Sequence, residues 1–205
     1  MSDLDGQIDL HPDEQGAVAN ASAKRIRHFA AGRACARAGL RSLGRGDEPV
    51  MTGDNRQPLW PAGTEGSISH TDGLCVAVVA LTEDLAGRRI GVDVEQRARV
   101  RPELYRKLFT AIEIEIIEGL PIGEQADAAT VAFSAKEAFY KAQYPITEAW
   151  VSFTDVRIER TTGGARAHRV TGLQALDAVQ WPVSVGVDIR DRHVVTAVTV
   201  VPARA

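Results

Sequence analysis

The most constraining feature of this 205-residue chain is residues 90–95, where apolar side chains alternate with two carboxylates. Alternate side chains of a β-strand share a face, so the pattern predicts a strand with Val92 and Val94 in a core. Asp93 and Glu95 then stand side by side on the opposite face. One interpretation is a half-buried strand with a solvated acidic face. The other is that a cation lies between the two carboxylates, because like charges so close together repel each other.

A helix that carries both a carboxylate and an ammonium group is predicted over residues 131–142, whose apolar residues recur at helical spacing. Glu137 precedes Lys141 by four residues, so an ordinary surface ion pair contributing roughly 0.3 kcal/mol is one interpretation. In the other, Glu137 joins Asp93 and Glu95 in an oxygen site for a hard cation. Lys141 would then face the phosphate groups that the cation holds.

Polar side chains that can bind phosphate gather just before the apolar strand predicted over residues 74–81; they are Ser67, Ser69, His70 and Thr71. A single histidine at such a junction of strand and loop is usually a structural hydrogen-bonding residue. Several hydroxyl groups beside it favour an anion site instead, because each can donate a hydrogen bond.

A stripe of arginines is expected on the helix predicted over residues 21–43, where Arg33, Arg37 and Arg41 recur every four residues. Such a stripe is often only a solvated face. Guanidinium groups also bind phosphate with paired donors, so a phosphate-bearing ligand is the competing interpretation.

Taken together, these segments resemble the 4′-phosphopantetheinyl transferase superfamily, in its small monomeric two-lobed type. Within it they resemble the subgroup that serves siderophore and related peptide synthetases, which includes enterobactin synthase component D. Each motif is short, but all four in this order are specific, and no metal-binding position departs from the pattern. The motifs are Arg-x-Pro-x-Trp-Pro-x-Gly at 56–63, Gly-Ser-Ile-Ser-His at 66–70, Gly-x-Asp-x-Glu at 91–95 and Phe-Ser-x-Lys-Glu-Ala-x-x-Lys at 133–141.

The resemblance implies an α+β fold of two pseudo-symmetric lobes with the active site in the cleft between them. The polar, arginine-rich link at residues 96–101 is the best boundary, which predicts lobes of residues 1–98 and 99–205. Asp93 and Glu95 would come from the first lobe and Glu137 from the second.

The activity that the resemblance implies is transfer of the 4′-phosphopantetheine arm from coenzyme A to a serine of an apo carrier protein, releasing adenosine 3′,5′-bisphosphate. Asp93, Glu95 and Glu137 would hold Mg²⁺. Glu137, or a water that it orients, would take the serine proton, and Lys141 would stabilise the departing phosphate. Because the carboxylates repel, removing Asp93 or Glu137 is expected to leave the fold intact or slightly more stable without metal.

The resemblance also implies where coenzyme A binds. Arg33 and Arg41 match best the basic residues that hold its 3′-phosphate, and Arg56 is a further candidate. Ser69 and His70 would bind phosphate. The partner would be an apo carrier domain of a peptide, polyketide or fatty-acid synthase, and residues 97–106 are the region to test for docking it.

Two other functions remain open from the residues. A Mg²⁺-dependent nucleotide pyrophosphohydrolase would use the same three carboxylates with water as the nucleophile. A non-catalytic module that binds carrier proteins would keep the fold, although such a module has no reason to concentrate repelling carboxylates.

Composition excludes several classes of protein. A net charge of −3 argues against a nucleic-acid-binding protein, which usually has a basic excess. Cys35 and Cys75 lack CxxC spacing, so we expect reduced, buried thiols and no metal–thiolate site. The acidic start of the chain is unlike a signal peptide, and no apolar run approaches the ~20 residues that span a bilayer. We therefore expect a soluble, cytoplasmic protein, and the resemblance implies a monomer.

The remaining elements follow from turn and capping signals. Residues up to 20 are predicted as a polar leader. Thr110 is expected to cap a helix through residue 119, with Glu113 at the capping-box position. The strand over residues 74–81 is expected to form a hairpin with one over residues 88–95. Further segments are a helix over 102–108, strands over 151–160, 165–170, 183–189 and 194–201, and a turn at 161–164.

Overall fold

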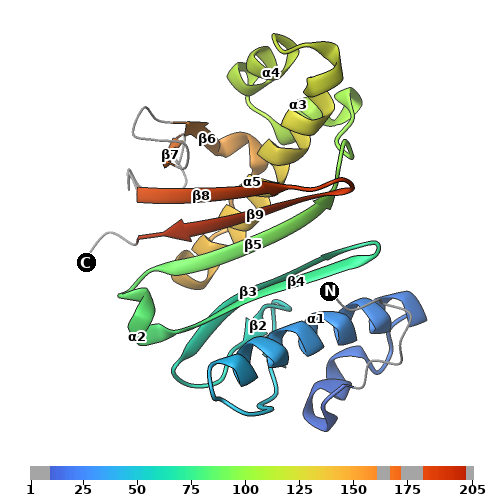
Figure 1. The fold of residues 1–205 in the computed structure, drawn as a ribbon, viewed down its shortest axis with the longest axis vertical. Coiled ribbons are helices and arrows are strands. Elements are labelled where there is room, and N and C mark those ends of the chain that lie inside the picture. The colour runs from blue at the N-terminus through green and yellow to red at the C-terminus, as the bar shows by residue number, and fades with distance from the viewer. Residues whose placement is uncertain (1–9, 161–166, 172–181, 202–205) are drawn as a thin grey trace. The chain divides into compact units, whose positions relative to one another are not determined.

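The computed structural model describes residues 10–160, 167–171 and 182–201 of the chain (Figure 1). It divides into two compact units, Met1–Gly87 and Arg88–Ala205. Both contain helices and antiparallel strands, so the α+β class predicted from the sequence is confirmed. Within the described ranges, no helix is long and apolar enough to cross a membrane.

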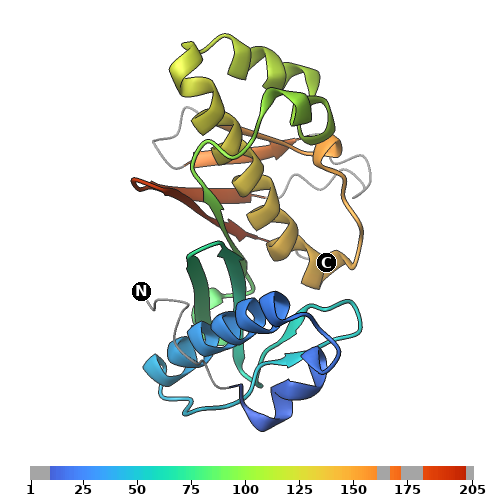
Figure 2. The same cartoon turned by 90° about the vertical axis from the view of Figure 1, so that its right-hand side faces the viewer.

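The first unit is built on one long helix, α1, packed against a two-stranded hairpin (Figure 2). Ala36 and Leu40 of the helix are fully buried against Ile68, Ala77 and Val79 of the hairpin. The elements of this unit are η1 (Pro12–Val18), α1 (Ala23–Ser42), β1 (Met51–Thr52), β2 (Pro58–Leu59), β3 (Thr64–Thr71), β4 (Leu74–Leu81) and α2 (Thr82–Leu85).

The hairpin is formed by β3 and β4, which pair antiparallel over their whole length. The prediction that residues 74–81 pair with residues 88–95 is therefore wrong. After β4 the chain forms the one-turn helix α2 and then passes through Ala86 and Gly87, which have φ angles of 48° and 81°. These left-handed conformations redirect the chain, and the next strand pairs within the second unit.

The predicted polar leader forms structure from residue 10 onward. His11 is the N-cap of η1: its side chain accepts a hydrogen bond from the backbone N–H of Asp13 (3.2 Å), and its own backbone N–H donates to Glu14 (3.2 Å). Glu14 is only 1% exposed. This segment is therefore part of the packed unit.

The second unit is a five-stranded antiparallel sheet in the order β5-β9-β8-β7-β6, with the long helix α5 packed against β5 and β9. Its largest core cluster joins Ala138 and Phe139 of α5 to Val185 and Val198 of the sheet. The elements are β5 (Arg89–Gln96), η2 (Pro102–Leu104), α3 (Tyr105–Leu108), α4 (Ala111–Glu118), α5 (Ile122–Thr147), η3 (Phe153–Asp155), β6 (Arg157–Arg160), β7 (Ala167–Thr171), β8 (Pro182–Ile189) and β9 (His193–Val200).

Local predictions for the second unit are largely confirmed. Thr110 caps α4 and forms a capping box with Glu113, and β8 pairs with β9 as expected. The strand predicted over residues 151–160 begins only at Arg157, because the capped turn η3 occupies the residues before it. The turn predicted at residues 161–164 lies outside the described residues.

The division between the units differs from the boundary predicted after residue 98. β5 belongs to the second unit because it pairs with β9 along its whole length and packs against α5. Asp93 and Glu95 therefore lie in the same unit as Glu137. The expectation that these three residues come from separate lobes is wrong.

A buried ion pair ties the short helices of the second unit to α5. Lys136 is 2% exposed, and its Nζ donates to Glu113 Oε2 (2.6 Å) and to the carbonyl oxygens of Leu108 (3.1 Å) and Phe153 (2.7 Å). Burial lowers the pKa of Lys136, and the contact with Glu113 opposes that shift. One ammonium group thus connects α3, α4 and η3 to α5.

Replacing Lys136 by methionine is expected to lower the free energy of unfolding by about 3 kcal/mol, because Glu113 then keeps a buried charge without its ammonium partner. Urea denaturation of both proteins measures this. Lys107→Met is the matched control, because Lys107 is an exposed lysine on α3; its effect should stay within about 0.5 kcal/mol. Equal effects of the two substitutions would contradict a stabilising role of the pair.

Candidate active site

The two acidic side chains of β5 are buried on the face that α5 covers. Gly91, Asp93 and Glu95 share this face because they alternate along the strand. A Cβ atom at Gly91 would lie 1.8 Å from the carbonyl oxygen of Ala138, so only glycine lets the two backbones approach so closely. Asp93 is 3% exposed and Glu95 8%. The interpretation of a solvated acidic face is therefore wrong.

Lys141 reaches across from α5 to this strand. Its Nζ donates to Asp93 Oδ1 (2.8 Å) and to the carbonyl oxygen of Val92 (3.2 Å). The side chain of Asp93 is only 5% exposed, so Lys141 supplies a cation to a buried carboxylate. An ordinary surface pair on the helix does not describe this arrangement.

Glu95 also has a cationic partner. Arg99 Nη1 lies 2.6 Å from Glu95 Oε2, and the arginine side chain is 57% exposed. The sequence suggested Arg99 as part of a polar link and of the docking region, but not as a partner of Glu95, although it lies four residues after Glu95. In the part of the chain that the structure describes, no three His, Cys, Asp or Glu side chains form a group that could hold a metal ion as they stand. Lys141 and Arg99 contact the carboxylates instead.

The carboxylates nevertheless act on one another electrostatically. Burial raises the pKa of Glu95, and the charge of Asp93 raises it further, while Arg99 opposes the shift. Burial also raises the pKa of Glu137; Lys141 lowers it and Asp93 raises it. Three oxygen donors with shared repulsion are the chemistry that suits a hard divalent cation, so the donor set fits Mg²⁺.

A cavity of about 210 Å³ lies beside Glu137 on α5. Tyr140 and Trp150 meet edge to face at its wall, with ring centroids 5.5 Å apart, and Trp150 is 77% exposed. No sequence pattern indicates this cavity, because Trp150 follows the end of α5 and its contact with Tyr140 depends on the path of that segment. The lining residues are Lys136, Glu137, Phe139, Tyr140, Trp150, Val151, Ser152, Phe153 and Val156.

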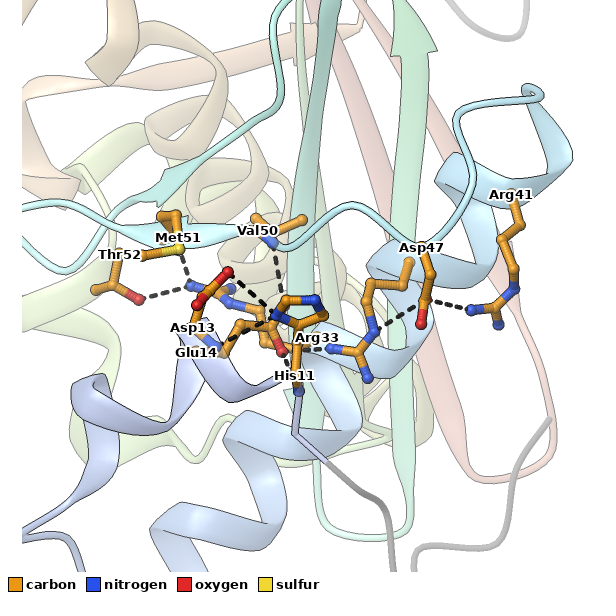
Figure 3. Close-up of polar contacts among 10 residues, drawn as sticks. His11, Asp13, Glu14, Arg33, Arg41, Asp47, Val50, Met51 and Thr52 are labelled. Carbon is orange, nitrogen blue, oxygen red and sulfur yellow. Dashed lines mark hydrogen bonds and ion pairs between the residues drawn. The ribbon is translucent and has the colours of Figure 1, made fainter.

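In the first unit the arginines of α1 have different surroundings (Figure 3). Arg33 is buried: its Nη2 donates to Thr52 Oγ1 (2.9 Å) and to the carbonyl oxygen of Met51 (3.2 Å). Its guanidinium lies over the ring of Phe29, 4.4 Å from the centroid. Burial lowers the pKa of Arg33 to about 10. Arg41 is half exposed and donates to Asp47 Oδ1 (2.7 Å).

Arg37, between them, connects α1 to η1 through an ion pair with the buried Glu14. Glu14 Oε1 also accepts a hydrogen bond from the backbone N–H of Val50 (3.0 Å; Figure 3). Arg37 Nε lies 3.3 Å from Asp47 Oδ1. The interpretation of a uniform solvated stripe is therefore wrong, because Arg33 and Arg37 are buried. Glu14 is a residue that sequence reasoning missed.

The remaining candidates for phosphate binding lie on β3 and in the turn between β1 and β2. Ser69 and His70 are consecutive residues inside the strand, so their side chains point to opposite faces. The loop of the predicted junction begins only after Thr71, and the cluster itself lies in the strand. The ring of His70 lies 4.7 Å from that of His28 on α1. Arg56 is exposed in the turn between β1 and β2, with a φ angle of 64°.

Two family models match the chain. The model of the 4′-phosphopantetheinyl transferase N-terminal domain matches residues 13–80, and that of the 4′-phosphopantetheinyl transferase superfamily matches residues 89–198. The chain belongs to the 4′-phosphopantetheinyl transferase superfamily. The candidates in the first unit lie inside the first match, and the carboxylates, Arg99 and Lys141 lie inside the second.

Curated members of the superfamily align with much of the chain. It is 34% identical to 4′-phosphopantetheinyl transferase Npt of Nocardia iowensis over 151 residues, which cover 74% of this chain and 66% of that protein. It is 34% identical to PptT of Mycobacterium tuberculosis over 148 residues, which cover 72% and 63%. Enterobactin synthase component D of Salmonella typhimurium is 39% identical over 127 residues, which cover 60% and 50%. The chain thus spans between 50% and 66% of the length of these relatives.

Proposed function

We propose that this chain transfers the 4′-phosphopantetheine arm of coenzyme A to a serine of an apo carrier protein and releases adenosine 3′,5′-bisphosphate. The observation that carries the proposal is the contact of β5 with α5, which gathers Asp93, Glu95, Glu137 and Lys141. Membership in the superfamily, whose curated relatives are named as transferases of this group, supports it.

The donor set fits Mg²⁺, which Asp93, Glu95 and Glu137 would hold. When bound, the ion would neutralise charge on the pyrophosphate of coenzyme A. The cations of Lys141 and Arg99 lie against the same carboxylates. Lys141 therefore lies beside the position that the ion and the phosphate oxygens would occupy.

Glu137 is the proposed acceptor of the serine proton. Burial raises the pKa of this carboxyl, which brings it nearer to neutral pH and makes it a stronger base than an exposed glutamate. Lys141, four residues later, carries the charge that stabilises the departing phosphate. The apolar cavity beside Glu137 suits the pantetheine arm, whose chain is largely aliphatic.

The direct test is mass spectrometry of an apo carrier protein incubated with this chain, Mg²⁺ and coenzyme A. The carrier should gain the mass of one phosphopantetheine arm, and a carrier whose acceptor serine is replaced by alanine should gain nothing. Unmodified carriers across a panel from peptide, polyketide and fatty-acid synthases would refute the proposal. We further propose that the chain acts as a monomer in the cytoplasm.

Arg41 is the α1 arginine best placed to bind the 3′-phosphate of coenzyme A, because it is half exposed while Arg33 is buried. Arg41→Ala should weaken coenzyme A binding by about 1.5–3 kcal/mol, the scale of a charge-assisted hydrogen bond. Calorimetry should show a much smaller loss for dephospho-coenzyme A, which lacks that phosphate. Arg27→Ala, an exposed arginine on the same helix, is the control. Equal losses for both ligands would remove Arg41 from the 3′-phosphate site.

Arg33, Arg56, Ser69 and His70 remain proposed ligands of coenzyme A. For Arg33 the proposal now requires the guanidinium to leave Met51 and Thr52, or to act by holding β1 in place. Residues 97–106 remain the proposed docking region for the carrier.

A further inference from the structure

The two cysteines of the chain lie in contact across the interface of α1 and β4. Cys35 Sγ lies 3.8 Å from the carbonyl oxygen of Cys75, and Cys75 Sγ lies 3.4 Å from that of Ser69. The two thiols are also close enough for Cys75 to affect the pKa of Cys35. Neither forms a disulfide in the structure, and both are only partly buried.

Glycines of α1 bring the two thiols together. A Cβ atom at Gly32 would lie 3.0 Å from Ile68 Cγ2 and 4.0 Å from Cys75 Sγ, and one at Gly39 would lie 2.5 Å from Val79 Cγ2. The helix therefore packs with its backbone close to the hairpin on both sides of Cys35. This close approach is what a disulfide between a helix and a strand requires, because its Cα atoms must lie within about 7 Å of each other.

The environment also favours reaction of Cys35. The hydrogen bond with Cys75 lowers the pKa of the Cys35 thiol to about 7, although burial opposes the shift. The lowered pKa favours the thiolate, which is the form that attacks peroxides and disulfides. Cys75 is then in position to resolve an oxidised Cys35.

We propose that Cys35 and Cys75 are a redox-active pair that peroxide converts to an intramolecular disulfide joining α1 to β4. The Cys35 thiolate attacks hydrogen peroxide, forms a sulfenic acid and releases hydroxide. The Cys75 sulfur then attacks the sulfur of the Cys35 sulfenic acid. The proton of the Cys75 thiol joins the leaving hydroxyl group, which departs as water. In total, two thiols lose two electrons and two protons, and one peroxide becomes two waters. A thiol reductant reverses the reaction.

The disulfide would act on the part of the hairpin that carries proposed ligands of coenzyme A. Cys75 is paired with His70 across β3 and β4 and contacts the backbone of Ser69. A bond from Cys75 to α1 therefore holds this end of the hairpin against the helix. The inference concerns the thiols alone and does not depend on the transferase activity.

Mass spectrometry after treatment with equimolar hydrogen peroxide tests the proposal on the full chain. The protein should lose the mass of two hydrogen atoms and remain monomeric on a non-reducing gel. Trypsin places Cys35 in peptide 34–37 and Cys75 in peptide 57–88, and these peptides should be found linked. Dithiothreitol should separate them. Separately oxidised cysteines, a disulfide-linked dimer or unchanged thiols would each overturn the proposal.

Thermal unfolding gives a second readout. Oxidation should raise the unfolding midpoint of the wild type by about 5 °C or more, because the bond closes a loop of the unfolded chain. Cys35→Ser and Cys75→Ser are the matched controls, and peroxide should leave their midpoints unchanged. A wild-type midpoint that does not rise although the peptides are linked would show that the disulfide strains the packing and would overturn its role in holding α1 to β4.

Discussion

Glu137→Gln is expected to lower kcat of the transferase reaction by about 10³-fold, because the amide cannot take the serine proton. The same substitution should raise the thermal unfolding midpoint at neutral pH in the absence of Mg²⁺. Burial raises the pKa of Glu137, so the folded state favours the protonated carboxyl and is destabilised when the carboxyl ionises. Glutamine removes that ionisation and keeps the shape of the side chain.

The pH dependence of this stability difference follows from the sign of the shift. A raised pKa in the folded state contributes stability that is fully present below the ordinary pKa of glutamate and is lost as the pH rises through the raised value. The gap in unfolding midpoint between Glu137→Gln and wild type should therefore be largest at neutral pH and close as the solution is acidified. Differential scanning calorimetry over this range measures it.

Glu124→Gln serves as the control, since Glu124 is an exposed carboxylate in the first turn of the same helix. Glu124→Gln should leave kcat unchanged, and the difference between its unfolding midpoint and that of the wild type should not grow between acidic and neutral pH. If Glu137→Gln had the same kcat as the wild type, Glu137 would not be the base that takes the serine proton. A gap that widens on acidification would contradict the direction of the pKa shift.

Lys141→Ala is expected to lower kcat by about 10²-fold, the range for losing a charge that stabilises a departing phosphate. It should also lower stability, because the buried carboxylate of Asp93 loses the ammonium group that lies 2.8 Å from it. The two effects can be separated with the double variant Asp93→Asn and Lys141→Ala. In that protein the buried charge is gone, so stability should largely recover while turnover remains low.

Lys141→Arg should restore only part of the turnover, since it keeps the charge but changes the shape and hydration of the cation. Single-turnover assays with an apo carrier and chemical denaturation provide the two measurements. Near wild-type turnover in Lys141→Ala would show that the lysine only supports the fold around Asp93. A double variant as active as wild type would refute the roles of both residues.

The contact between Lys141 and Asp93 also changes what is expected of Asp93 itself. The sequence suggests that removing Asp93 or Glu137 relieves repulsion and leaves the metal-free protein as stable as before or slightly more stable. In the structure, Glu95 and Glu137 have raised pKa values, whereas Asp93 is paired directly with Lys141. Asp93→Ala should therefore be destabilising, because it leaves the ammonium group partly buried beside an apolar side chain.

Features that depend on a few neighbouring residues could be predicted from the sequence. The capping box of Thr110 and Glu113 requires only a hydroxyl and a carboxylate three residues apart at a helix start. The strand face shared by Asp93 and Glu95 follows from the alternation of side chains along any strand. The order of the four short motifs was enough to identify the superfamily, which the family models confirm.

Features that depend on contacts between distant segments were decided by the tertiary structure alone. The sequence could not tell whether β5 pairs with β4 or with β9, because both are apolar strands. The left-handed turn at Ala86 and Gly87 and the packing of α5 decide for β9. The partner of Lys141 is likewise set by where α5 crosses β5.

The burial of charges shows the same division. The sequence presents Glu14, Arg37 and Lys136 as ordinary charged residues, and periodicity places Arg37 on a solvated stripe. Each is buried because a distant segment supplies an opposite charge. The attraction within the pair offsets part of the free-energy cost of removing the two charges from water, which a single charge would bear alone. The contact between Cys35 and Cys75 is also decided by long-range packing. No local spacing in the sequence indicates that these two residues meet across α1 and β4. Local geometry thus determined the elements and their motifs, and long-range packing determined which side chains meet.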